Sequence, residues 1–267
     1  MTFRSLLFVP GNRPERFEKA LGAGADAVCF DLEDAVAPEA KDAARAAVID
    51  FLSRGGRAGL GVRINGPASE HLDADCRALS GLPVAFVMIP KVESPGQVAS
   101  LSLRLGDARP LWPIIESPEG LRQAWDIASA VGVGGVLFGA ADYSAEVGCT
   151  LEWDALLYAR GALAAAAARA GVELLDVPYL DIADETGLAD STGRAKALGF
   201  TGRACIHPGQ VEIVNTAYTP AAAEVDRARR IVSAFDASNG GAALLEGKLI
   251  ELPVVRAARR TLERTGV

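Results

Sequence analysis

Eight short apolar segments recur along the 267-residue chain, spaced about thirty residues apart, the length of one strand–helix unit. Each segment is almost continuously apolar, as a parallel strand covered on both faces should be. The stretches between them, such as 95–106, carry the spacing of amphipathic helices. The eight predicted strands lie within residues 4–11, 26–34, 58–66, 85–93, 110–117, 134–142, 172–180 and 202–208.

Eight strands that each precede a helix predict an α/β fold, the (β/α)8 TIM barrel, which needs about 250 residues. An open doubly wound sheet is the alternative, but it would want a G-x-G-x-x-G loop after its first strand, where this chain has FVPGNRPE. We therefore predict a barrel catalytic core over residues 1–215. Residues 216–267 predict a C-terminal helical extension that serves as a lid or as an intersubunit contact. It is expected to contain one helix, a short extended piece, a turn at Pro253 and a last helix.

Composition narrows the class of protein. Half of the residues are hydrophobic, enough for a sizeable core, yet no apolar run is long enough to cross a membrane or to form a signal-peptide core. We expect a cytoplasmic protein. The net charge of −7 disfavours nonspecific binding to nucleic acid or to anionic membranes. The four cysteines are spread out without a C-x-x-C pair, which predicts buried free thiols rather than zinc ligands or disulfides.

Acidic side chains follow three of the predicted strands, and an arginine follows a fourth. Catalytic groups of a (β/α)8 barrel come from the carboxyl ends of its strands, so these residues are expected to meet. Like charges gathered at one barrel mouth repel unless a cation lies among them. Carboxylates without Cys or His partners suit Mg²⁺. The candidates are Glu33, Asp34, Arg63, Glu116 and Asp142.

The strand order assigns a role to each candidate. Glu116 and Asp142, which follow neighbouring strands, are the predicted metal ligands, and Glu33 and Asp34 are expected to hold metal-bound waters. Positions left open on Mg²⁺ suit the carboxylate and keto oxygen of a 2-oxo acid. Arg63 is predicted to bind that carboxylate through two hydrogen bonds.

Small residues before Asp142 are also candidates for substrate binding. Gly139 and Ala140 allow the backbone to approach a ligand closely and to offer N–H donors.

Each assignment has a structural alternative. Glu116 and Asp142 could each cap the helix that starts beside them, and Glu33 and Asp34 could cap the helix after the second strand. Arg63 could pair with Asp31 or Glu33 without touching a substrate. Lys91, at the end of the fourth strand, could pair with nearby carboxylates or stand at the rim of the site.

Seven motifs occur in a fixed order: RSLLFVPGNRPERFEKA, DAVCFDLEDAV, VRING, IPKVES, IIESPEGL, LFGAADYSAEVG and ACIHPGQV. On these motifs the chain resembles, over essentially its whole length, the citrate lyase β-subunit-like branch of the HpcH/HpaI aldolase superfamily. The resemblance implies a Mg²⁺-using (β/α)8 barrel that cleaves or forms a 3-hydroxyacyl-CoA such as citryl-, malyl- or citramalyl-CoA, with an acyl-CoA and a 2-oxo acid as the other reactants.

The resemblance also assigns residues. It implies Glu116 and Asp142 as metal ligands and Arg63 as the substrate-carboxylate binder. It places the coenzyme A thioester near the first strand–helix loop, where Arg13, Arg16 and Lys19 are expected to hold phosphates. A homotrimer or hexamer is expected, and no partner subunit of a larger lyase complex can be inferred.

The C-terminal segment departs from the family pattern. Many relatives read G-x-M-I-D-x-P there, with the Asp acting as the acid/base, often from a neighbouring subunit. This chain reads GKLIELP, which puts Glu251 at that position. The longer side chain moves the carboxylate by about 1 Å, enough to affect rate. The alternatives to the lyase are an aldolase acting on free hydroxy-oxo acids without CoA, a non-catalytic metal- or oxo-acid-binding accessory protein, and an acyl-CoA hydrolase.

Overall fold

A computed structural model of the chain describes residues 3–55, 59–106, 108–238 and 241–264. Parts of three predicted segments lie outside these ranges. They are Ala58, the first residue of the third strand segment, and residues 239–240 and 265–266, the ends of the two C-terminal helical segments. The chain divides into two units, Met1–Asn215 and Thr216–Val267.

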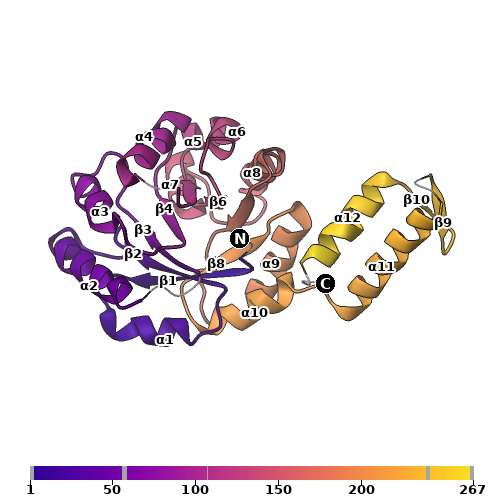
Figure 1. The fold of residues 1–267 in the computed structure, drawn as a ribbon, viewed down its shortest axis with the longest axis horizontal. Helices are drawn as coiled ribbons and strands as arrows, with labels where there is room; N and C mark the ends of the chain where they lie inside the picture. Colours follow the sequence, from indigo (N-terminus) through magenta and orange to yellow (C-terminus); the bar gives the residue numbers. More distant parts are fainter. Residues whose placement is uncertain (1–2, 56–58, 107, 239–240, 265–267) are drawn as a thin grey trace. The chain divides into compact units, whose positions relative to one another are not determined.

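The first unit is a closed barrel of parallel strands in the order β1 to β8, with helices around it (Figure 1). The predicted (β/α)8 fold is therefore confirmed. The strands are β1 (Ser5–Pro10), β2 (Ala27–Asp31), β3 (Leu60–Arg63), β4 (Phe86–Ile89), β5 (Leu111–Ile115), β6 (Gly135–Phe138), β7 (Glu173–Asp176) and β8 (Gly202–Cys205).

Helical segments follow the strands in the chain and surround the barrel. They are η1 (Pro14–Arg16), α1 (Phe17–Leu21), η2 (Pro38–Ala40), α2 (Lys41–Ser53), α3 (Leu72–Leu79), α4 (Pro95–Leu105), α5 (Pro118–Arg122), α6 (Ala124–Ala128), α7 (Ala140–Val147), α8 (Leu157–Ala170), α9 (Glu185–Leu198) and α10 (Gly209–Tyr218). Among the described residues, none of the helices is both long and apolar enough to span a membrane.

Large side chains fill the barrel interior where neighbouring strands carry glycine. Gly61 is the register partner of Phe86, and a Cβ on Gly61 would lie 2.2 Å from that ring. A Cβ on Gly135 would lie 2.5 Å from the ring of Trp112. Phe86 and Trp112 belong to one buried core cluster, to which several strands contribute.

The side-chain period of a strand explains how the core leads to the barrel mouth. Successive strand residues point to opposite faces, so alternate residues share one face. In β5 the core residues Trp112 and Ile114 are followed at the same period by Glu116. In β2 the core residues Ala27 and Cys29 are followed by Asp31. The polar site therefore continues the inward-facing rows of the core.

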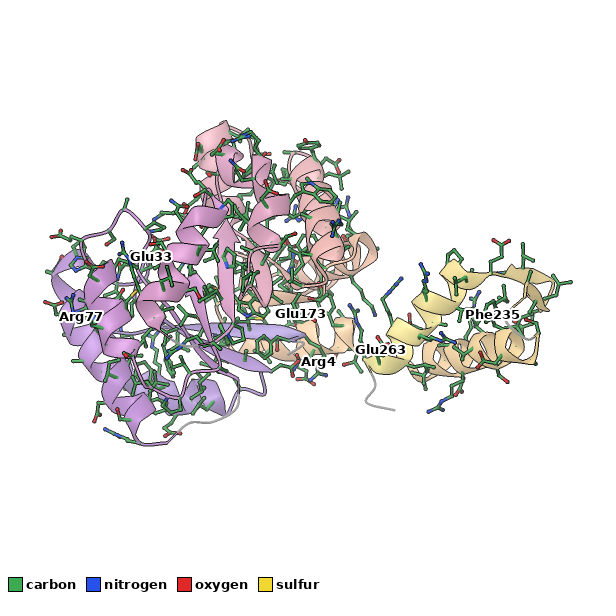
Figure 2. All side chains as sticks on the ribbon, turned by 45° about the horizontal axis from the view of Figure 1, so that its top comes forward. Arg4, Glu33, Arg77, Glu173, Phe235 and Glu263 are labelled. Carbon is green, nitrogen blue, oxygen red and sulfur yellow. The ribbon has the colours of Figure 1, made fainter. Side chains whose placement is uncertain are left out.

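The second unit has its own small core. It contains α11 (Ala222–Ala237), the antiparallel pair β9 (Ala243–Leu245) and β10 (Lys248–Ile250), and α12 (Leu252–Glu263). Phe235, labelled in Figure 2, packs in this core with Val255.

The turn predicted at Pro253 is wrong. Pro253 is the second residue of α12, where a missing N–H costs nothing and the fixed φ suits a helix. The chain reverses instead at Glu246 and Gly247, whose φ values of 51° and 74° suit a tight hairpin turn.

The cysteines are free, as predicted: Cys29, Cys76 and Cys205 are buried, whereas Cys149 is only partly buried.

Candidate active site at the barrel mouth

Asp31 and Arg63 form the base of the site. They are register partners at the ends of β2 and β3. Nε and Nη2 of Arg63 each donate to one oxygen of Asp31 at 2.6 Å. Asp31 is buried and also accepts the backbone N–H groups of Glu33 and Ala35. The predicted ion pairing of Arg63 is therefore present, and two of its nitrogens are already bonded within the protein.

Glu33 lies between two cations. Its Oε2 is 3.2 Å from Nη1 of Arg63, and its Oε1 is 2.5 Å from Nζ of Lys91. Burial raises the pKa of Glu33, while the charge of Arg63 opposes this shift. Asp34 is more exposed and lies 3.8 Å from Arg63 and 3.5 Å from Lys91. Glu33 is labelled in Figure 2.

Glu33 and Asp34 do not cap the helix that follows them. The N-terminal neighbours of η2 and α2 are Ala37 and Ala40, neither of which makes a side-chain cap. The Glu33 carboxylate instead accepts the N–H of Asp34. The capping alternative for this pair is therefore wrong.

Glu116 is a buried carboxyl group with one strong donor. It is only 6% exposed, and its Oε1 accepts the backbone N–H of Lys91 at 2.6 Å. Burial raises its pKa to about 8, and the nearby charges of Asp142 and Glu33 add to that effect. Ser117, not Glu116, caps α5, because its hydroxyl accepts the N–H of Gly120. Glu116 is thus not held there by a capping role.

Gly139 is the residue that makes room for Glu116. The register of β5 and β6 pairs Ile115 with Phe138, and the N–H of Gly139 bonds to the carbonyl of Ile115. A Cβ on Gly139 would lie 2.5 Å from both Cβ and Oε2 of Glu116. Ala140, which is buried, begins α7, and the exposed Asp142 lies in its first turn without acting as a cap.

Two cavities meet at these carboxylates. The acidic cavity, about 750 Å³, is lined by residues that include Glu33, Asp34, Lys41, Lys91, Glu116 and Asp142. The apolar cavity, about 380 Å³, is lined by residues that include Phe8, Arg63, Leu137, Gly139, Val177 and Ile206. Asp34, Glu116 and Asp142 line both, so a ligand at these three side chains can extend into either cavity.

The carboxylates are suited to a hard cation with few protein ligands. Among the described residues, no group of three or more His, Cys, Asp or Glu side chains is arranged to hold a metal. A cation here would have two protein ligands, Glu116 and Asp142, and would leave its other positions to water and substrate, as Mg²⁺ commonly does. The raised pKa of Glu116 fits this chemistry, because a bound cation would offset the cost of a buried negative charge.

The three cations predicted to hold phosphates lie apart from this cluster. Arg13, Arg16 and Lys19 are exposed on and beside η1 and α1, directly after β1, and Arg16 lies 3.9 Å from Glu15. They do not line either of the two cavities. Glu251 is exposed in the second unit, at the residue before α12.

A second buried ionic group joins the last residue of β7, Asp176, to Arg203, the second residue of β8. Asp176 bonds Nη2 of Arg203 and, at 3.1 Å, Nε of Arg160. Arg203 also donates to Ser191 and Thr192 of α9. We did not predict this group from the sequence, where its residues are separated by helices. The signals available there were two arginines in otherwise apolar segments.

Comparisons with known proteins agree with this architecture. The sequence model of the family HpcH/HpaI aldolase/citrate lyase matches residues 4–208. The chain therefore belongs to the HpcH/HpaI aldolase/citrate lyase family.

Its relatives include enzymes and solved structures. A (3S)-malyl-CoA thioesterase of Cereibacter sphaeroides is 35% identical, with 98% of this chain and 94% of that protein covered. A citrate lyase subunit beta-like protein of Mycobacterium tuberculosis is 37% identical, with 97% and 94% covered. The crystal structure of CitE from Mycobacterium tuberculosis with magnesium, acetoacetate and coenzyme A is 35% identical, has a TM-score of 0.86 and covers 100% of this chain and 99% of that one.

Proposed function

We propose that this protein is a Mg²⁺-dependent carbon–carbon lyase that cleaves or forms a 3-hydroxyacyl-CoA, with acyl-CoA and a 2-oxo acid as the other reactants. The observation that carries the proposal is the position of Glu116: a buried carboxyl beside Asp142, on the shared wall of two cavities. Relatives at 35–37% identity include a malyl-CoA thioesterase and a citrate lyase subunit beta-like protein. A solved relative holds magnesium, acetoacetate and coenzyme A together.

In this proposal Glu116 and Asp142 hold the Mg²⁺ ion. When bound, the ion supplies a Lewis acid that polarises the oxygen destined to become the keto group. Glu33 and Asp34 orient water around the ion, and Arg63 binds the carboxylate of the 2-oxo acid. Gly139 and Ala140 leave space for the substrate at the start of α7.

The chain's own groups handle the proton. In the cleavage direction a base removes the proton of the 3-hydroxyl group, and the electron pair of the carbon–carbon bond passes to the thioester α-carbon. Protonation of that enolate gives the acyl-CoA, and the former hydroxyl carbon becomes the keto carbon. We assign the acid/base role to Glu251, which takes the place of the family Asp.

The coenzyme A part is assigned to the first strand–helix loop. Arg13, Arg16 and Lys19 are exposed cations in a row after β1, available to phosphates. From the family resemblance, the proposal includes a homotrimer or hexamer working in the cytoplasm.

A hydrolase is the second candidate, favoured by the relative described as a (3S)-malyl-CoA thioesterase. In that reaction water adds to the thioester carbonyl and the CoA thiolate leaves, so the carbon skeleton stays intact.

One experiment separates these reactions. The protein is incubated with citryl-, malyl-, citramalyl- and β-methylmalyl-CoA in Mg²⁺ or in EDTA, and the products are identified by mass spectrometry. A lyase gives a shorter acyl-CoA plus a 2-oxo acid, only with Mg²⁺. A hydrolase gives free CoA plus the intact hydroxy acid. Cleavage that is equally fast in EDTA would contradict the metal-dependent proposal.

A further inference from the structure

The guanidinium of Arg63 has only one nitrogen that is not committed to Asp31. Nε and Nη2 each donate to an oxygen of Asp31 at 2.6 Å, and Asp31 is almost completely buried. Nη1 lies 3.2 Å from Oε2 of Glu33. Nη1 carries two N–H groups, so a substrate carboxylate that binds there has to lie beside Glu33, whose like charge repels it unless another cation balances that charge.

Lys91 holds the other oxygen of the same carboxylate. Its Nζ lies 2.5 Å from Oε1 of Glu33, so Arg63 and Lys91 approach Glu33 through different oxygens. If a substrate carboxylate takes Nη1, Glu33 still keeps a charged hydrogen-bond partner. Without the ammonium group, Glu33 would have Arg63 as its remaining cation and would compete for Nη1 more strongly.

The backbone of Lys91 is fixed in an unusual conformation. Its φ of 56° is in the left-handed region, which side chains with a Cβ rarely adopt. In this conformation its N–H donates to Oε1 of Glu116 at 2.6 Å. Strain of this kind is typical of functional sites, where the surrounding structure holds a residue in place. One residue thus contacts Glu116 through its backbone and Glu33 through its side chain.

We infer that Lys91 is a positioning residue that draws Glu33 away from Nη1 of Arg63 and balances its charge, and so keeps this nitrogen available to the carboxylate of the 2-oxo acid. The inference rests on the proposed function and deepens it. It assigns the affinity for the substrate carboxylate to a set of three side chains, Arg63, Glu33 and Lys91, rather than to Arg63 alone.

Binding measurements on Lys91→Met test this inference. Calorimetry gives the Kd of Mg²⁺ alone and the Kd of pyruvate or oxaloacetate at saturating Mg²⁺. Pyruvate binding should weaken by about tenfold, the scale of one charge-assisted hydrogen bond. Mg²⁺ affinity should stay the same or increase, because a nearby positive charge has been removed. A general loss of structure would weaken both.

Double substitution supplies the sharper readout. Adding Glu33→Gln to Lys91→Met removes the competing charge, so pyruvate affinity should return to within about threefold of the parent protein, in line with the non-additivity expected of contacting residues. Lys91→Arg, which keeps the charge, should bind nearly as the parent does. Arg104→Met serves as the control, because Arg104 is an exposed cation on α4 that pairs with Asp73 and does not line the two cavities.

Three results would overturn the inference alone: unchanged pyruvate binding in Lys91→Met, no recovery in the double variant, or equal weakening of Mg²⁺ and pyruvate with a lower Tm. If the parent protein itself shows no Mg²⁺-dependent binding of 2-oxo acids, the proposed function fails and this inference fails with it.

Discussion

The barrel unit carries two ionic groups, one at the barrel mouth and one between β7, β8 and the helices α8 and α9, and they differ in how completely their charges are paired. Around β2 to β6, Asp31, Glu33 and Asp34 pair with Arg63 or Lys91, and Glu116 and Asp142 add two further carboxylates, of which Glu116 has a raised pKa. At β7 and β8, Asp176 is enclosed between Arg160 and Arg203, which is hydrogen-bonded onward to α9. The first group has surplus negative charge, whereas in the second, whose Arg160 and Arg203 line a cavity of about 390 Å³, the one carboxylate is fully paired and links strands to helices. We interpret the first as a ligand site and the second as structural support.

The largest expected effect is that of Glu116→Gln. An amide cannot replace the charged ligand, so lyase activity should fall by a factor of about 10³ or more. The pyruvate-induced rise of Tm in Mg²⁺ should also disappear. The measurements are steady-state rates on the preferred CoA thioester and thermal unfolding with and without Mg²⁺. Near-normal activity in a correctly folded variant would mean that the two ionic groups do not differ as described.

The next largest effect belongs to the paired group. Asp176→Asn leaves two buried guanidinium groups without their shared carboxylate, and such a loss costs about 3–5 kcal/mol of the free energy of unfolding. For a domain of this size, Tm should fall by roughly 10 °C.

Asp176→Asn should differ from Glu116→Gln in its effect on Mg²⁺ binding. The Asp176→Asn protein that remains folded at low temperature should keep its Mg²⁺ affinity, which calorimetry at 10 °C would measure. A variant that kept its Tm but lost Mg²⁺ binding would reverse the roles of the two groups.

The sequence predicted the fold and placed Glu33, Asp34, Arg63, Glu116 and Asp142 at the barrel mouth, because both depend on strand order and on the carboxyl ends of the strands. The structure adds that Glu116 and Asp31 extend the inward rows of β5 and β2. The left-handed backbone of Lys91 could not be predicted, since a lysine does not itself signal positive φ. Nor could the pairing of Asp176 with Arg160 and Arg203, because it depends on how α8 packs against the barrel.

The position of the Glu251 carboxylate is another feature that the sequence alone does not give. Its place in the family motif was readable, but the motif alone does not fix where the carboxylate lies. The structure adds that Glu251 is exposed and directly precedes α12.

A smaller effect is expected from Gly139→Ala. The new Cβ would lie 2.5 Å from Cβ and Oε2 of Glu116 and would force that carboxylate to move. A displacement of about 1 Å at a catalytic group can cost about 10²-fold in rate, so activity should fall by about tenfold to a hundredfold. Titrations with Mg²⁺ measure the change in metal affinity, and steady-state rates measure the change in activity. Unaltered Mg²⁺ affinity would show that Glu116 does not need its present position.

The smallest effect is expected from a matched glycine-to-alanine substitution beside the Asp176 group. Gly161→Ala lies in α8, next to Arg160, and a Cβ there has no atom within 4 Å apart from its chain neighbours and the backbone of its own helix. Alanine favours the helix over glycine by about 0.8–1.0 kcal/mol, so Tm should rise by about 2–4 °C with activity unchanged. The same chemical change is thus expected to damage the open group and to strengthen the support around the paired one. If Gly161→Ala reduced activity as much as Gly139→Ala, the β7–β8 side would take part in catalysis, and its interpretation as structural support would be wrong.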